Sequence, residues 1–323
     1  MKTVKVIILT AVLLVLGVFY KRFKSKLDEQ DALSDYDIVK QFLLNDSSIA
    51  TSSKPLLWLH SEQAPNARNW ESFYSRMNTK TNQPYLSLTI KSIIDTCGES
   101  FNICLIDDES FKNIIPGWNV DLGRIGNPVK QRVRELALMK VLYYYGGLVV
   151  PTSFLALKDL GPLYNKNTSD GKMVSAELLN RSLSGGQAAV FPSTKFVGCE
   201  KESQICKELV DEMERQVSSD LTDMPSIKAV SGDWLHNGGL NGKVKIIPGQ
   251  LVGTVDVKGE AIGVEELLGQ SRVDLNDDCY GLLIPSDEIL KRTSYNWFAR
   301  LSPKQVVGSN TFIGKMTLAA LSG

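Results

Sequence analysis

The sequence contains few of the residues that most often bind metals, since 323 residues include five cysteines and two histidines. No two cysteines form a C-x-x-C pair, the spacing that structural zinc sites usually use, so the pattern argues against zinc. The spacings from Cys97 to Cys104 and from Cys199 to Cys206 could bring each pair together in space. We favour the other interpretation, in which these thiols are free and buried.

An excess of charge of either sign is also absent. Lys and Arg number 36, as do Asp and Glu, so the formal net charge is zero. A general nucleic-acid binder needs a basic surface, and this balance argues against one. Apolar residues make up 43% and charged residues 22% of the chain, as in ordinary globular proteins. The length allows one large α/β domain or two small ones.

One uncharged apolar run, residues 6–20, precedes the globular part of the chain. It is shorter than the about 20 residues of a typical membrane span, but Val4 adds apolar length and Lys5 can reach the interface. The cationic segment 21–26 follows in place of a small-residue cleavage site, so we predict an uncleaved signal anchor rather than a cleaved signal peptide. Cations flank both ends of the run, which leaves open the side of the membrane on which the body lies.

The chain is organised around residues 130–160, which predict a helix, a turn and a strand. Apolar side chains at helical spacing indicate a largely buried helix up to Tyr145. Gly146 and Gly147 end it, because glycine accepts left-handed backbone angles. Residues 148–150 then form a short apolar run, typical of a buried strand that ends at Pro151.

Six residues of this stretch match a known pattern: Arg134, Leu142, Tyr145, Gly146, Gly147 and Leu148. They resemble the arginine, aliphatic helix, Tyr-Gly-Gly turn and aliphatic strand of the DXD-containing sugar transferases of the mannosyltransferase and capsular-polysaccharide type. The resemblance covers residues 54–160. It implies an α/β fold of the nucleotide-diphospho-sugar transferase (GT-A-like) kind, with a mostly parallel sheet flanked by helices, here behind an N-terminal membrane anchor helix. It also implies a nucleotide sugar as ligand.

The two acids of the family pattern are missing. In the family, Asp-x-Asp follows the strand and holds a divalent metal that bridges the donor diphosphate, whereas this chain has Pro151, Thr152 and Ser153. Proline offers no ligand and serine is a poor neutral one for a hard cation, so we predict no metal site here. The one Asp-x-Asp of the chain, residues 35–37, precedes the globular part, where a solvated helix start is the alternative.

A strand over residues 54–60, a helix over 85–96 and a strand over 101–106 predict a parallel sheet, whose ligands bind beyond the carboxyl ends of the strands. His60 stands at the first of these ends and is similar to a family histidine near the nucleotide, although strand-end histidines are often structural. The acids at 107–109 follow the second end, where capping of a short helix is the alternative.

Four cations lie at or before the start of the central helix: Arg124, Lys130, Arg132 and Arg134. Cations and free backbone N–H groups both favour anions, so this cluster could hold a diphosphate without a metal. A solvated basic helix face is the alternative.

The predicted site therefore combines proton acceptors with donor-binding groups. As catalytic acids or bases we propose Asp107, Asp108 and Asp233. As donor-binding residues we propose His60, Arg132, Arg134, Tyr145, Gly146, Gly147, Thr152, Ser153 and His236. Asp233 and His236 are included because the resemblance implies a later acid or histidine near the donor.

The remaining patterns divide the chain into an anchor (1–26), a stalk (27–53), a transferase-like α/β domain (54–243) and an α+β extension packed on it (244–323). Further helices are expected over 69–77, 199–218, 265–268, 286–292 and 312–321. Further strands are expected over 172–176, 188–191, 244–248, 251–257 and 280–285, and a loop over 153–163.

Three functions fit these observations. The first is a membrane-anchored sugar transferase with a metal-independent site. The second is an inactive descendant of the fold that serves as an accessory subunit, with protein partners in a membrane-associated assembly. The third is a lectin-like module in which Trp58, Trp70, Trp118 or the tyrosines 143–145 stack on sugars, although aromatic residues in apolar runs usually belong to the core.

Overall fold

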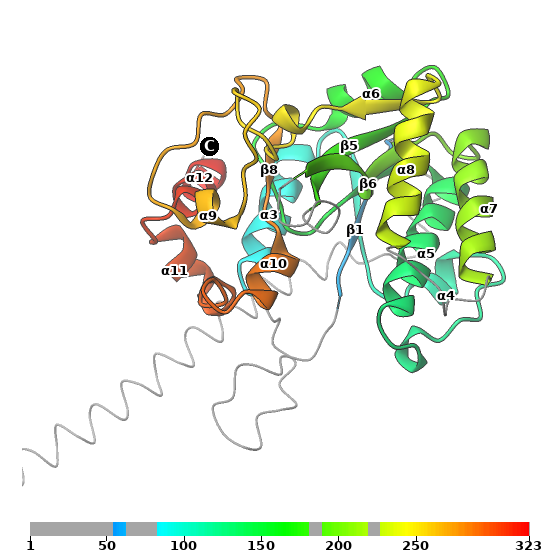
Figure 1. Ribbon diagram of the computed structural model, residues 1–323, viewed down its shortest axis with the longest axis horizontal. Coiled ribbons are helices and arrows are strands. Elements are labelled where there is room, and N and C mark those ends of the chain that lie inside the picture. Colours follow the sequence, from blue (N-terminus) through cyan, green and yellow to red (C-terminus); the bar gives the residue numbers. More distant parts are fainter. Residues whose placement is uncertain (1–53, 63–82, 181–188, 219–226, 323) are drawn as a thin grey trace, which may run out of the picture. The chain divides into compact units, whose positions relative to one another are not determined.

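The structure is a computed structural model that describes residues 54–62, 83–180, 189–218 and 227–322 (Figure 1). The predicted anchor, the stalk with its Asp-x-Asp and the helix at 69–77 lie outside these residues. Within the described ranges, no helix is both long enough and apolar enough to cross a membrane.

A six-stranded sheet forms the centre, in the order β2-β1-β3-β6-β5-β7. Its strands are β1 (Leu56–His60), β2 (Asn102–Ile106), β3 (Gly147–Val150), β5 (Met173–Asn180), β6 (Ala189–Cys199) and β7 (Val244–Ile247). β1 pairs in parallel with β2 and β3, and β5 pairs in parallel with β7, whereas β6 runs antiparallel to β3 and β5. The predicted α/β class is therefore confirmed, with a sheet that is parallel apart from β6.

Helices flank this sheet. They are α3 (Leu86–Cys97), α4 (Phe111–Ile114), the short 3-10 helix η2 (Leu122–Arg124), α5 (Val129–Tyr145), α6 (Gly161–Thr168), α7 (Gln204–Ser218) and α8 (Ile227–Leu240). α5 and α7 pack together, and α8 packs on β6 and β7 (Figure 1). The predicted central helix and the strand after it match α5 and β3.

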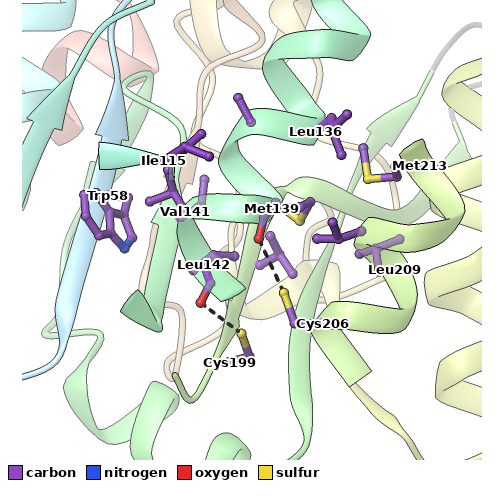
Figure 2. Close-up of a cluster of buried hydrophobic side chains, with 14 of the residues drawn as sticks. Trp58, Ile115, Leu136, Met139, Val141, Leu142, Cys199, Cys206, Leu209 and Met213 are labelled. Carbon is purple, nitrogen blue, oxygen red and sulfur yellow. Dashed lines mark hydrogen bonds between the residues drawn. The ribbon is translucent and has the colours of Figure 1, made fainter. Parts of the chain in front are cut away.

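The main core lies between α5, α7 and the sheet. Met139 and Leu142 of α5 and Leu209 of α7 are completely buried there (Figure 2). The thiols of Cys199 and Cys206 donate to the carbonyl oxygens of Leu142 and Met139, over 3.8 and 3.5 Å (Figure 2). All five cysteines are free and buried, as predicted.

A second apolar cluster joins the C-terminal part of the chain to α3. Its residues come from β4 (Phe154–Ala156), β8 (Gly281–Leu283), α9 (Val264–Leu268), α10 (Ser286–Lys291), α11 (Pro303–Val307), α12 (Phe312–Ser322) and the 3-10 helix η4 (Phe298–Arg300). Another 3-10 helix, η3 (Gly249–Leu251), contacts β5 of the main sheet. β4 and β8 form an antiparallel two-stranded sheet. β7, the first segment of the expected extension, belongs instead to the main sheet, because it pairs with β5.

Two local predictions are wrong. Residues 153–163 were expected to be a loop but contain β4 and the start of α6, because Leu155 pairs with Leu282 from far along the chain and Pro162 suits a first helical turn. Residues 251–257 are not a strand; Gly253 has φ +64°, which turns the chain there.

The tyrosine–diglycine bend lies directly against the parallel strands. Gly146 and Gly147 have φ +70° and +103°, and a Cβ on Gly147 would lie 2.1 Å from the Leu56 carbonyl oxygen of β1. The indole of Trp58 donates to the Gly146 carbonyl over 2.9 Å. Glycine is therefore required here both for its backbone angles and for the close approach of two strands.

Candidate functional site

The carboxyl ends of β1 and β2 leave the sheet side by side. His60 pairs with Ile106 in the parallel register, and the Ser61 amide donates to the Ile106 carbonyl over 2.8 Å. The segments that follow, with Glu62 and Asp108, therefore start from one edge of the sheet. Open α/β sheets bind their ligands at such an edge, so we take it as the candidate site.

Arg134 of α5 reaches this edge and grips Asp108 with two hydrogen bonds. Its Nε donates to Asp108 Oδ1 over 2.7 Å and its Nη2 to Oδ2 over 2.6 Å. Paired parallel bonds of this kind fix the orientation of an arginine and hold its charge beside the carboxylate. The Arg134 side chain is 8% exposed and that of Asp108 24%, so the pair is largely shielded from water.

Two further side chains face the same carboxylate. His60 Nε2 lies 3.1 Å from Asp108 Oδ1, and the imidazole stacks on Phe111 with ring centres 5.3 Å apart. Lys130 Nζ lies 3.8 Å from Asp108 Oδ2. Asp108 is thus the centre of a network that joins β1, the segment after β2 and α5.

The network keeps Asp108 ionised. Partial burial acts to raise the pKa of Asp108, but hydrogen bonds from His60 and Arg134, together with their charges, outweigh it and hold the pKa well below its ordinary value. For Arg134, burial acts to lower the pKa, and the bonds and charges of Asp108 and Glu62 raise it above its ordinary value. A carboxylate with so low a pKa is a poor proton acceptor near neutral pH.

The remaining amino group of Arg134 contacts a second acid. Nη1 lies 2.9 Å from Glu62 Oε2, and the Glu62 side chain is 50% exposed. Sequence reasoning missed Glu62, although its place two residues after the end of a predicted parallel strand was a usable signal.

Lys195 of β6 is a second residue that sequence reasoning missed. Val149 of β3 pairs with Val197 of β6 in antiparallel register. Lys195, two residues before Val197, therefore lies beyond the carboxyl end of β3. Its Nζ lies 3.1 Å from Asp287 of α10. Burial acts to lower the pKa of Lys195, but the charges of Asp287, Glu135 and Glu62 raise it above its ordinary value.

Asp107 has a local role in the structure. Its Oδ1 accepts hydrogen bonds from the Glu109 and Ser110 amides, over 3.1 and 2.9 Å, and from the Ser110 hydroxyl over 2.7 Å. These bonds shape the turn before α4, as the capping alternative expected. Asp107 and Asp108 are neighbours in sequence but make different contacts.

Asp233 and His236 lie on α8, and both are exposed. The imidazole of His236 stacks on Phe191 of β6, with ring centres 5.2 Å apart. Within the described part of the chain, no hydrogen bond or ion pair joins either residue to the network around Asp108. Their proposed roles near the donor stay predictions.

The segment in place of Asp-x-Asp is tied to the second apolar cluster. The Thr152 carbonyl accepts a hydrogen bond from Thr89 of α3 over 2.5 Å, and the Ser153 carbonyl accepts one from the Ile284 amide over 3.0 Å. Ser153 is 5% exposed. No group of three or more His, Cys, Asp or Glu side chains suited to a metal occurs among the described residues.

The other predicted residues have mainly structural contacts. The Tyr145 hydroxyl donates to the Ile114 carbonyl over 2.7 Å. Arg132 is half-buried. Burial lowers its pKa, although the charge of Glu135 acts to raise it. Trp58 is completely buried, so it cannot stack on a sugar, whereas Trp118 packs at the edge of the main core.

Two surface depressions lie away from the network. One, of about 440 Å³, is lined by Lys54, Tyr164 and Glu200, near the amino end of β1. The other, of about 430 Å³, is lined by Arg272 and Phe312 in the C-terminal part. The network around Asp108 is therefore built from ion pairs rather than around either depression.

Comparison with known proteins gives a weak structural similarity. No protein-family model matches the chain, and no curated protein matches it. A solved structure described as "PaToxG Glycosyltransferase" is similar at 12% identity and a TM-score of 0.30, over 65% of this chain and 81% of that one. The strand order and the layers described above therefore define the fold, and membership of the sugar-transferase family stays a prediction.

Proposed function

We propose that this chain is a glycosyltransferase-like protein that binds a nucleotide sugar at the carboxyl edge of β1, β2 and β3 and transfers the sugar without a divalent metal. The observation that carries this proposal is the position of Arg134. Asp108 fixes its guanidinium from one side, and Nη1 remains directed to the open, half-exposed side at Glu62.

Charge neutralisation is the chemistry that a metal supplies to such a reaction, and it is worth several kcal/mol. A guanidinium held in one orientation can supply part of it, because its planar fork matches phosphate oxygens and needs no reorganisation during the reaction. Lys130, near Asp108, adds a second cation at the same edge. Arg132, two residues before Arg134 on α5, is the third proposed contact.

In the proposed reaction, the bond between the anomeric carbon and the diphosphate oxygen breaks, and its electron pair leaves with the diphosphate. The acceptor hydroxyl oxygen forms the new bond to this carbon, and its proton passes to a base or to the departing phosphate oxygen. We assign Asp108 the positioning of Arg134, because its bound carboxylate is a poor base. Of the other proposed bases, Asp233 has the exposed carboxylate, whereas that of Asp107 is bound to its own turn.

Calorimetric titration with nucleoside diphosphates and sugar nucleotides tests this function, with Mn²⁺ and with EDTA. We expect binding in EDTA that weakens about tenfold or more in Arg134→Lys, because lysine keeps the charge but loses the fork. Arg215→Lys, on the exposed face of α7, is the matched control and should bind like the wild type. Absence of binding under all conditions, with both variants folded by circular dichroism, would rule the function out.

The second candidate function is a non-catalytic accessory role in an assembly. One observation favours it: the formal charges of Lys130 and Arg134 are cancelled within the network by those of Glu62 and Asp108. An anionic donor must then compete with carboxylates that are already in place. Turnover of any sugar nucleotide by the wild type would contradict this role.

We also propose that residues 6–20 anchor the protein in a membrane, on the sequence pattern alone. Alkaline extraction of membranes from cells that express the full chain or a variant lacking residues 1–26 tests this. The full chain should stay with the membranes and the truncated chain should be released. Release of both would contradict the anchor.

A further inference from the structure

We infer that Glu62 is a built-in competitor for the anionic group of a ligand: its carboxylate occupies an anion-binding position on the Nη1 side of Arg134, and a phosphate-bearing ligand must displace it. The inference deepens the proposed function and rests on it for the identity of the ligand, a nucleoside diphosphate or its sugar ester.

The two sides of the Arg134 guanidinium differ in how firmly they are held. Nε and Nη2 both donate to the largely shielded carboxylate of Asp108, over 2.7 and 2.6 Å. Nη1 makes a single contact of 2.9 Å with Glu62, whose side chain is half-exposed. Water screens the second contact far more than the first, so Glu62 is the partner that can leave while Arg134 stays in place.

Lys195 is a second cation in the electrostatic surroundings of Glu62. Its ammonium group is under the electrostatic influence of Glu62 as well as of Glu135, and it pairs with Asp287 at 3.1 Å. Glu62 therefore interacts with two cations that come from different elements, α5 and β6. A carboxylate that contacts a guanidinium, with a second cation in its surroundings, is in an environment that also favours a phosphate group.

The chemistry of the ligand follows from the charges. A phosphate carries more negative charge than a carboxylate and has three acceptor oxygens, so it can bond to Arg134 and Lys195 together. Removal of the competing charge should therefore strengthen phosphate binding. Inorganic pyrophosphate is the simplest probe, since it lacks both the base and the sugar.

The test is calorimetric titration of the full chain with pyrophosphate in EDTA, for the wild type, Glu62→Gln and Glu109→Gln. Glu109 is an exposed acid beside Asp108, and among the described residues no ion pair joins it to Arg134, so its variant removes the same charge near the same edge without breaking a contact of Arg134. We expect Glu62→Gln to bind pyrophosphate about fivefold more tightly, since an exposed ion pair is a weak competitor, and Glu109→Gln to change little. Adding Lys195→Met to Glu62→Gln should abolish the gain, whereas adding Lys207→Met, on the surface of α7, should not.

The outcomes separate the two proposals. Three results would overturn the competitor role: equal affinities for the wild type and Glu62→Gln, equal gains in both Gln variants, or weaker binding by Glu62→Gln. None of these results contradicts the proposed sugar transfer. A gain in Glu62→Gln without any binding of sugar nucleotides would support the anion position and contradict the proposed function. No pyrophosphate binding by any folded variant would overturn the competitor role, whereas the titration with sugar nucleotides alone decides the proposed function.

Discussion

The carboxyl end of β3 and the carboxyl ends of β1 and β2 belong to the same parallel layer but have opposite character. β3 ends in buried backbone bonds, since Thr152 and Ser153 accept hydrogen bonds from α3 and from the segment after β8. β1 and β2 end in the charged network of His60, Asp108 and Arg134. The comparison indicates that the carboxyl end of β3 is a packing element, and that the polar chemistry lies at the ends of its neighbours.

The largest effect is expected at the bend that precedes β3. Gly147→Ala should destabilise the protein by more than about 4 kcal/mol, because the new Cβ would overlap the Leu56 carbonyl and the backbone angle disfavours L residues. Urea unfolding followed by circular dichroism measures this. Gly171→Ala is the control: it has φ +70° and open space around it, so it should cost only the backbone strain, about 1–2 kcal/mol.

The next largest loss of stability is expected when an acid is placed at the end of β3. Ser153→Asp should destabilise by about 3 kcal/mol, because a carboxylate is placed where the side chain is 5% exposed. If this end packs rather than binds metal, Mn²⁺ should not restore the stability of Ser153→Asp or of Pro151→Asp with Ser153→Asp. A rise in melting temperature on adding Mn²⁺ to the double variant alone would contradict the conclusion that the end of β3 serves packing.

The charged ends are tested by removing one partner of the central ion pair. Arg134→Met should destabilise by about 3 kcal/mol, because Asp108 would keep a shielded charge without its main partner. Combining it with Asp108→Asn should recover part of the loss. Fully additive losses in this double-mutant cycle, measured by urea unfolding, would mean that the two residues are not coupled.

Acid should weaken the same network. Because the pKa of Asp108 is lower in the folded protein than in the unfolded chain, its contribution to stability is present above the unfolded value, about 3.9. The contribution is lost as the pH falls through the folded value. Between pH 6 and pH 3 the free energy of unfolding should therefore fall less in Asp108→Asn than in the wild type; equal falls would contradict the coupling.

The smallest effect on stability is expected at Lys195. Lys195→Met should cost less than about 1 kcal/mol, because its ion pair with Asp287 is partly exposed on both sides. Melting curves of this variant beside Lys207→Met should be similar. A much larger loss would mean that Lys195 supports the fold rather than the anion position.

Local patterns were enough to predict much of the parallel layer. Short apolar runs predicted β1, β2 and β3, and apolar side chains at helical spacing predicted α5. Gly146 and Gly147 marked the bend because their backbone angles restrict the choice of residue. Partners distant in sequence were not predictable: Leu155 pairs with Leu282, and Lys195 meets Asp287, across about a hundred residues or more. No short-range signal specifies such pairs, so neither contact could be predicted from the sequence.

The pairing of β7 with β5 and of β8 with β4 has a practical consequence. A chain that ended after residue 243 would lack β7 and β8. β5 in the main sheet and β4 in the small sheet would then each expose an unpaired edge. The C-terminal quarter is therefore no detachable module: trimming or exchanging it should yield aggregates rather than a minimal catalytic unit, and expression of shortened forms would need to keep both returning strands.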